Sequence, residues 1–345
     1  MKGYKQLYFW SFLLIFLSCV KEDTIKIKIG EPKLVLNAGI KPGQEITAFL
    51  TQSAAAGSSL QDLELKTPPT IRVYINNEFK GNMIKEKEEE TDGYYGELIK
   101  GLYSLPEIKP ATGDRVRLEA EAIGFETVSA EIKIPEAPEM LLVDTVRYLS
   151  GYSNQEKMRL YIKLKDKPQE NNYYRAILKS QMSDEGDGSV TPRTNQFYEE
   201  YVYDYGSYNV MVDYEDIVFT TDLPMHILNG SRQNYYGIFS DNLFNGKEYI
   251  LRLSFSTYFY NYTTKEEDNK AKYRLRLISI TEDYYNYYKQ SNLLSFSVGS
   301  IQLAPSREFL NTYSNVNNGF GLVFAYNESI QDIIVNRNLM EDGEE

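Results

Sequence analysis

The only cysteine of the chain, Cys19, follows Ser18 at the end of a short apolar run from Leu7 to Leu17. Lys2 and Lys5 precede this run, and the order of basic residues, apolar core and small residue is typical of a secretory signal. Eleven residues are too few to cross a bilayer. The pattern predicts a bacterial lipobox, in which cleavage precedes the cysteine and the thiol then carries acyl chains such as palmitate. The alternative is an ordinary signal peptide with an incidental cysteine.

The residues directly after the cysteine predict where the anchored protein goes. Lys21, Glu22 and Asp23 resemble the short acidic signal that sends lipoproteins of Bacteroidota to the outer face of the outer membrane. Several acyl chains on one cysteine give stable anchoring, whereas a single chain binds only reversibly. We therefore expect a lipid-anchored protein of the outer membrane, exposed at the cell surface. A solvated tether without a sorting role is the alternative for these three residues.

Residue types for other chemistry are scarce. The only histidine is His226, and no G-x-S-x-G motif is present to supply a nucleophilic serine. A local hydrogen bond explains this histidine better than catalysis does, and histidine-based metal sites lack support. The acidic stretch from Ser183 to Gln196 lacks the spacing of a calcium-binding EF-hand and is interpreted as a loop. We predict no cofactor, no metal and no enzymatic activity.

Two classes of residue keep further alternatives open. A glycosidase needs only two carboxylates about 5–10 Å apart, and 49 Asp and Glu leave room for such a pair. Tyrosine is dense in two stretches, and it suits both half-buried strands and recognition surfaces. Packing is the first interpretation, and a ligand-binding surface is the second, for Tyr201, Tyr203, Tyr205, Tyr284, Tyr285 and Tyr288.

The charge balance argues against a nucleic-acid partner. The formal net charge of the 345 residues is −12. Loss of the signal peptide removes two of 37 basic residues and none of 49 acidic ones, which leaves a net charge of −14. Binding to phosphates needs a basic face, so the mature chain is better suited to a soluble body held beside the membrane surface.

The elements that must position these residues are mainly strands. Short alternating segments, such as Arg115 to Ala122, recur about every ten residues between turn residues, which favours an immunoglobulin-like β-sandwich. Pro135 to Pro138 then forms a stiff boundary. The predicted divisions are a signal peptide (1–18), an acylated cysteine with its tether (19–24), the sandwich (25–137), a larger β-rich domain (138–338) and an acidic tail (339–345).

The second domain is expected to carry one short helix. At the end of the strand from Tyr273 to Ile280, Ser279 or Thr281 can cap a helix, and the two acids that follow favour a helix N-terminus. Such a helix must dock on a sheet because it would not hold alone. Two more strands are expected after it, at Gly319 to Tyr326 and at Ile330 to Val335.

Short motifs throughout the mature chain are similar to those of one family. They are Asp92 to Tyr95, Gly113 to Leu118, Gly124-Phe125, Ile134-Pro135, Asp144 to Val146, Phe239 to Lys247, Leu275 to Tyr285 and Gly319 to Tyr326. In these stretches the chain resembles the Bacteroidota lipoproteins called domain of unknown function 4249. The resemblance implies a cell-surface lipoprotein that is often encoded beside TonB-dependent receptors. It implies no catalytic residues.

Three hypotheses for the function follow. The first is an accessory binding lipoprotein that works with a TonB-dependent receptor in nutrient capture, whose own ligand the sequence does not identify. The second is a glycan- or protein-binding adhesin module, which the tyrosines support and which the loss of Trp10 with the signal peptide weakens. The third is a hydrolase that uses two carboxylates.

Overall fold

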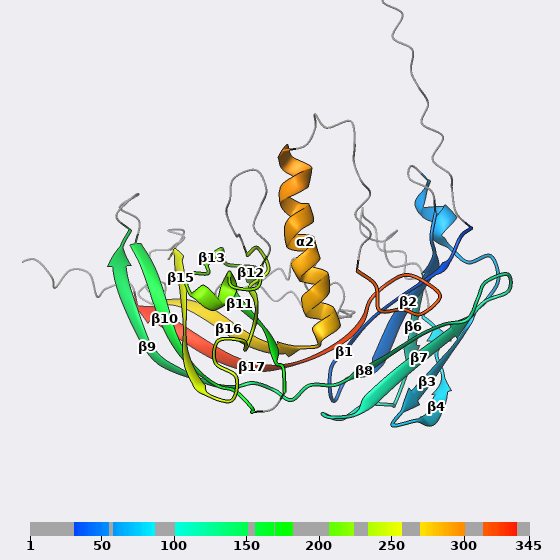
Figure 1. Cartoon of the computed structure of the whole chain (residues 1–345), viewed down its shortest axis with the longest axis horizontal. Coiled ribbons are helices and arrows are strands. Elements are labelled where there is room, and N and C mark those ends of the chain that lie inside the picture. The colour runs from blue at the N-terminus through cyan, green and yellow to red at the C-terminus, as the bar shows by residue number, and fades with distance from the viewer. Residues whose placement is uncertain are drawn as a thin grey trace, which may run out of the picture. The chain divides into compact units, whose positions relative to one another are not determined.

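Alternation of apolar and polar residues gives a mainly β structure, as predicted (Figure 1). This computed structural model describes residues 31–54, 58–86, 101–150, 156–168, 170–181, 207–223, 234–256, 270–300 and 313–336. From Pro32 onward the chain forms one compact unit. The first residues of the predicted sandwich (25–30) and the predicted acidic tail (339–345) lie outside the described residues.

The first half of the unit is a β-sandwich of two four-stranded layers. One layer has the order β1 (Leu34–Ile40), β2 (Ile46–Gln52), β6 (Leu102–Leu105) and β5 (Ile84–Lys85). The other has the order β4 (Glu78–Asn82), β3 (Thr70–Ile75), β7 (Arg115–Glu121) and β8 (Val128–Lys133). These orders match strands A-B-E-D and C′-C-F-G of an immunoglobulin-like sandwich. The prediction of that fold is confirmed. A 3-10 turn, η2 (Leu60–Leu63), lies in the connection before β3.

Both layers bury one face in a shared core. Alternate residues of each strand point inward, so Leu36, Leu50, Val73 and Leu118 are almost completely buried in the same cluster. Each such side chain contributes about 1.5–3 kcal/mol relative to an exposed one. The polar residues of the same strands, such as Arg117, stay on the outer faces.

The second half is also built from two layers. One is a four-stranded sheet in the order β13 (Val212–Asp213), β15 (Glu248–Ser256), β10 (Glu156–Lys165) and β9 (Glu139–Leu149). The other contains β12 (Ser207–Asn209), β11 (Tyr173–Gln181), β16 (Lys270–Ile280) and β17 (Val323–Asn336), with β14 (Ile238–Ser240) paired to β11. A second core lies between the layers, and the 3-10 turn η4 (Ile217–Phe219) inserts two residues into it.

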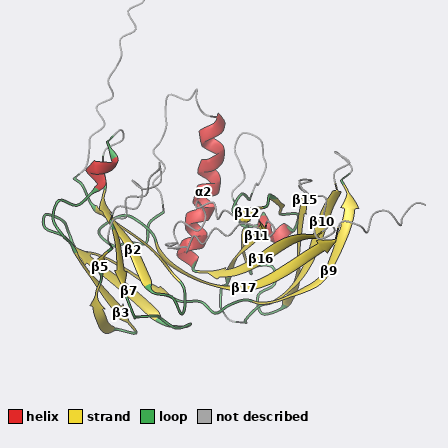
Figure 2. Ribbon diagram, turned by 180° about the vertical axis from the view of Figure 1, so that it is seen from behind, coloured by secondary structure: helices red, strands yellow, loops and turns green. Residues whose placement is uncertain are grey.

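The predicted helix is α2 (Glu282–Ser300), the one α-helix of the described ranges. It begins directly after β16 with Glu282 and Asp283 in its first turn, where negative charge meets the positive end of the helix dipole. Figure 2 shows it next to β11 and β16, and it contacts β11, β14 and β17. Its aromatic residues close a third apolar cluster on the sheet face that lies opposite the second core.

The last strand, β17, is longer than the sequence predicts. The two strands expected at Gly319 to Tyr326 and Ile330 to Val335 are a single strand of 14 residues. Its first three residues, Val323–Ala325, pair in parallel with β1, and the residues from Tyr326 to Asn336 pair with β16. Val323 and Ala325 therefore belong to the first core, whereas Ile333 and Val335 belong to the second. One continuous nine-stranded sheet runs through both halves of the chain.

Polar residues in the middle of β17 explain why the sequence suggests a break there. Asn327 donates from Nδ2 to the Pro135 carbonyl at 3.1 Å, and the Ser329 hydroxyl donates to the Pro138 carbonyl at 2.6 Å. Both acceptors belong to the proline-rich boundary segment, which has few backbone donors of its own. The polar residues therefore interrupt the apolar pattern without interrupting the strand, because their side chains bind the boundary segment.

The approach of β17 to β1 depends on one glycine. Gly321 has φ of +117°, and a Cβ atom at this position would lie 2.1 Å from the Leu36 carbonyl oxygen. Phe320 and Leu322 on either side accept backbone hydrogen bonds from Leu36 and Ala38 at 2.9 and 3.0 Å. A side chain at residue 321 would therefore push the two strands apart where they meet.

Replacement of this glycine is expected to be costly. Gly321→Ala should lower the free energy of unfolding by at least about 2 kcal/mol, since backbone strain and the clash with Leu36 add together. Gly43→Ala is the matched control, because Gly43 has φ of +76° and a Cβ atom there would meet nothing within 4 Å, and it should cost about 1 kcal/mol. Urea denaturation followed by circular dichroism measures both. Equal losses in the two variants would contradict the proposed role of the close approach.

Candidate functional site

Most residues singled out from the sequence lie outside the described ranges. They are Cys19, Lys21, Glu22, Asp23, Tyr201, Tyr203, Tyr205 and His226. Their predicted roles stay predictions. The remaining three, Tyr284, Tyr285 and Tyr288, lie on α2 and are 8%, 3% and 7% exposed.

The tyrosines of α2 pack against the sheet below the helix. The Tyr284 ring stacks on Phe324 of β17 with centroids 4.2 Å apart and an interplanar angle of 2°. Tyr285 lies 4.8 Å from the ring of Tyr173 on β11. Helical spacing places residues 284 and 288 on one face, and that face is the buried one. These side chains form core, so they present little surface to a ligand.

A buried arginine completes this cluster. Arg175 of β11 is 8% exposed, and its Nη1 donates to the Tyr284 hydroxyl at 3.0 Å while Nε donates to the Tyr236 carbonyl at 2.9 Å. Its guanidinium lies 4.8 Å from the ring centroid of Tyr288, a cation–π distance. Burial, with a smaller contribution from the Tyr284 phenol, raises the pKa of Tyr288 well above its usual value. The Tyr288 phenol therefore stays protonated, and the tyrosines of this cluster serve as packing and hydrogen-bonding groups.

Asp166 and Asp241 are buried, and both carboxylates accept hydrogen bonds from neighbouring groups. Asp166 accepts from the Tyr174 hydroxyl at 2.6 Å and from the Gly246 N–H at 2.7 Å. Asp241 accepts from the Asn172 N–H at 2.9 Å. Burial raises the pKa of Asp241, hydrogen bonds from Asn172 oppose the rise, and the nearby charge of Asp166 adds to it. These contacts fix the turn from Asp241 to Lys247, so a structural role accounts for this pair.

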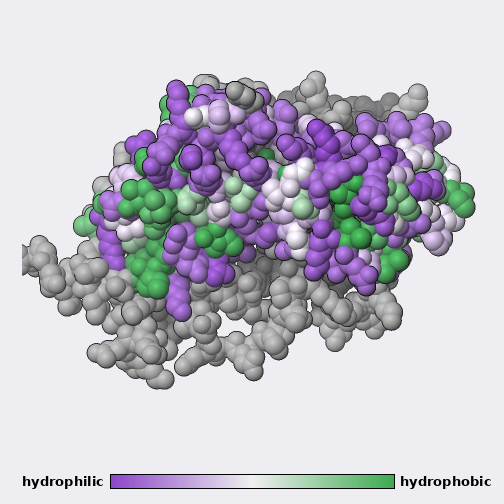
Figure 3. Space-filling view, turned by 90° about the horizontal axis from the view of Figure 1, so that it is seen from below, coloured by the Kyte–Doolittle hydropathy of each residue, from purple (hydrophilic) through white to green (hydrophobic). Residues whose placement is uncertain are grey.

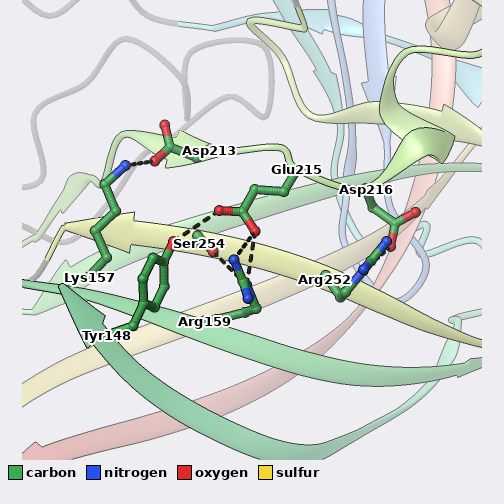
Figure 4. A network of polar contacts seen from close by, with 8 residues as sticks. All are labelled: Tyr148, Lys157, Arg159, Asp213, Glu215, Asp216, Arg252 and Ser254. Atoms are coloured by element: carbon green, nitrogen blue, oxygen red, sulfur yellow. Dashed lines mark hydrogen bonds and ion pairs between the residues drawn. The ribbon is translucent and has the colours of Figure 1, made fainter. Parts of the chain in front are cut away.

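A polar network lies on the outer face of the β13-β15-β10-β9 sheet (Figure 4). Arg159 binds Glu215 at 2.7 Å, and the Tyr148 hydroxyl donates to the same carboxylate at 2.9 Å. Lys157 pairs with Asp213. Arg252 and Asp216 form a further ion pair at 3.2 Å. Burial opposes ionisation of Glu215, but the bonds from Tyr148, Ser254 and Arg159 prevail and lower its pKa. The network holds the segment of residues 213–216 across the edge of the sheet.

The most buried ion cluster joins the two halves of the molecule. Glu328 of β17, with a side chain 6% exposed, contacts Lys41 at 2.5 Å and Arg276 at 2.6 Å. Lys41 follows β1 of the first sandwich, whereas Arg276 belongs to β16 of the second. Burial alone would raise the pKa of Glu328, but the two cations outweigh it and hold the pKa below its ordinary value. The carboxylate is therefore ionised at neutral pH.

Within the described ranges, no group of three or more His, Cys, Asp or Glu side chains is placed to hold a metal ion. None of the helices in that part of the chain is long and apolar enough to cross a membrane.

Comparison with known families identifies the chain at the level of its family. The family model described as domain of unknown function (DUF4249) matches residues 21–332. The chain belongs to this family. The suspected resemblance is thereby confirmed, and the match covers both β-sandwiches and the boundary between them.

Comparisons with individual proteins add little to the family assignment. No curated protein matches the chain. Among solved structures it is similar to the zebrafish (Danio rerio) Fcho1 Mu homology domain with bound Eps15 peptide, at 8% identity over 86% of this chain and 92% of that one. The TM-score is 0.17, so this likeness supports no conclusion about fold or function.

Two features of the structure were not predicted from the sequence. Glu328 gives no sign of burial, because its partners Lys41 and Arg276 are 287 and 52 positions away. The second is β9, which pairs on one side with β10 and on its other side with no strand of the described residues. Its sequence does carry a signal, since apolar residues between Met140 and Leu149 occur at both odd and even positions. That pattern departs from the alternation expected of a strand with one covered face.

Loss of the charge on Glu328 is expected to destabilise the protein in a pH-dependent way. Glu328→Gln should lower the free energy of unfolding by about 3 kcal/mol at pH 7, because it leaves two cations without their shared partner. A lowered folded-state pKa adds stability above the unfolded value of about 4.3. The difference between wild type and variant should therefore shrink as the pH falls below that value, as urea titrations at several pH values would show.

Asp332→Asn is the matched control for this prediction. Asp332 lies on the same face of β17 and pairs with Arg274 at 2.8 Å, but its side chain is 55% exposed. An exposed pair contributes about 0–1 kcal/mol. A loss for Glu328→Gln no larger than that for Asp332→Asn would refute the bridging role of Glu328.

Proposed function

We propose that this protein is a surface lipoprotein of the outer membrane that serves as an accessory binding component of a TonB-dependent receptor in nutrient capture. The observation that carries the proposal is the order of residues from Lys2 to Cys19, which combines a basic start, an apolar core and a single cysteine after Ser18. Acylation at that cysteine would hold the folded body at the membrane surface.

The architecture supports this reading. The compact unit begins at Pro32, thirteen positions after Cys19 in the sequence. The two β-sandwiches share a continuous sheet, which makes a stiff support for binding surfaces. The resemblance implies that such lipoproteins are often encoded beside TonB-dependent receptors, so membership of the DUF4249 family supports a receptor partner.

The lipid anchor has a direct test. Cys19→Ala should abolish incorporation of labelled palmitate and move the protein from the detergent phase to the aqueous phase of a Triton X-114 separation, because no acyl chain remains to enter the micelle. Ser18→Ala is the matched control, since alanine is also small and should permit acylation. Continued labelling of the Cys19→Ala variant would show that the cysteine is not the anchor.

The location and the partner are tested in intact cells. The wild-type protein should be removed by added protease, whereas a variant with alanine at Lys21, Glu22 and Asp23 should keep its lipid but become protected. Affinity capture of the surface-exposed protein after mild cross-linking should recover an outer-membrane TonB-dependent receptor. Protection of the wild type would contradict surface exposure, and capture without any such receptor would contradict the partnership.

A further inference from the structure

The β13-β15-β10-β9 sheet ends in a long strand with one open side. β9 pairs with β10 over Glu139 to Leu149, with a single bulge between the partners of Tyr161 and Ile162. No strand of the described residues pairs with its other side. Such an edge presents unpaired N–H and C=O groups, and proteins usually protect it with charge, proline or short length.

The two edges of this sheet differ in how they are protected. The β13 edge is two residues long, and Asp213, Glu215 and Asp216 tie it to neighbouring strands through ion pairs. The β9 edge is eleven residues long. Its large apolar side chains are exposed by 60%, 54%, 40% and 63% at Leu141, Val143, Val146 and Leu149. Figure 3 shows apolar residues gathered on the side where Figure 1 labels β9 and β10.

The charges on β9 indicate what kind of strand fits there. Glu139 pairs with Lys165 at 3.4 Å, and Arg147 pairs with Glu156 at 3.5 Å. Asp144 has no ion pair among the described residues, and its carboxylate accepts a hydrogen bond from the adjacent Thr145 N–H at 2.8 Å. It lies exposed between the apolar residues of the edge. Charges of opposite sign on facing strands attract, and like charges repel.

We propose that the β9 edge is a strand-pairing site for an extended segment of a partner protein, in which a Lys or Arg lies opposite Asp144 and aliphatic residues cover Val146 and Leu141. Main-chain hydrogen bonds to an open edge provide the affinity in this mode of recognition, and alternate side chains provide the specificity. The inference deepens the proposed function by stating how a protein partner is held, and it needs no lipid anchor.

A second copy of this chain fits the edge less well. The only cation on β9 is Arg147, which already pairs with Glu156. Arg147 is also opposite the buried Met158, whereas Asp144 is opposite Tyr161 on the outer face. Antiparallel pairing of two β9 strands therefore supplies no free cation to Asp144. The net charge of −12 likewise favours a basic partner over a copy of the same chain.

The test uses two nine-residue probe peptides of alternating valine and threonine, one with a central lysine and one with a central glutamate. Fluorescence anisotropy with detergent-solubilised full-length protein should show saturable binding of the lysine peptide. Asp144→Lys should weaken that binding about threefold to tenfold and strengthen binding of the glutamate peptide by a similar factor. Val146→Lys should weaken both, and Ile123→Lys, at an 80% exposed position of the first sandwich, should change neither.

Backbone pairing is separated from simple charge attraction by N-methylation. Of two lysine peptides methylated on alternate amides, only the one methylated on the side that faces β9 should lose binding. Failure of the lysine peptide to bind, equal effects of both methylation patterns, or no reversal by Asp144→Lys would overturn the proposal. So would a stable dimer in light scattering that Val146→Lys abolishes, because it would assign the edge to a second copy. None of these outcomes bears on acylation of Cys19, so the anchor is judged separately.

Discussion

The structure depends on one strand that belongs to two cores. β17 places Val323 and Ala325 in the first sandwich and Ile333 and Val335 in the second, while its opposite face carries Phe324 and Tyr326 under α2. A strand has only two faces and period-two alternation, so a shift of one residue would move all of these side chains to the wrong face together. The register of β17 against β1 and β16 is therefore the constraint that both halves must satisfy at once.

Polar residues in the middle of β17 favour one alignment of this shared strand. Between the two apolar stretches, Asn327 and Ser329 hold the proline-rich boundary segment, and Glu328 accepts Lys41 and Arg276 from opposite sides. A buried ion cluster adds little net stability compared with apolar packing, but it penalises arrangements that leave a charge unpaired. In this molecule the observed register of β17 brings all three charges together. The polar middle of β17 thus selects the alignment, and the apolar ends provide the free energy.

Local pattern was enough to predict the β class, the immunoglobulin-like sandwich and the helix after Ile280, because alternation and capping act over a few residues. It failed at residues 327–329, where polar side chains suggested a break, since their partners are distant in sequence. For Tyr284, Tyr285 and Tyr288 it favoured packing but kept a ligand-binding surface as the alternative, because tyrosine serves both purposes. Their burial depends on how α2 docks on the sheet, which the sequence of the helix alone does not reveal.

The central position of β17 also decides which edges stay open. Because it pairs on both sides, the large sheet continues through the molecule, and the β13-β15-β10-β9 sheet is left as a separate layer with two edges of its own. At one edge, ion pairs hold the short β13 and the residues that follow it to β10 and β15. At the other, β9 follows directly after the boundary segment that Asn327 and Ser329 hold. The contacts that fix the register of β17 therefore also fix the start of β9, and with it the position of the apolar open edge.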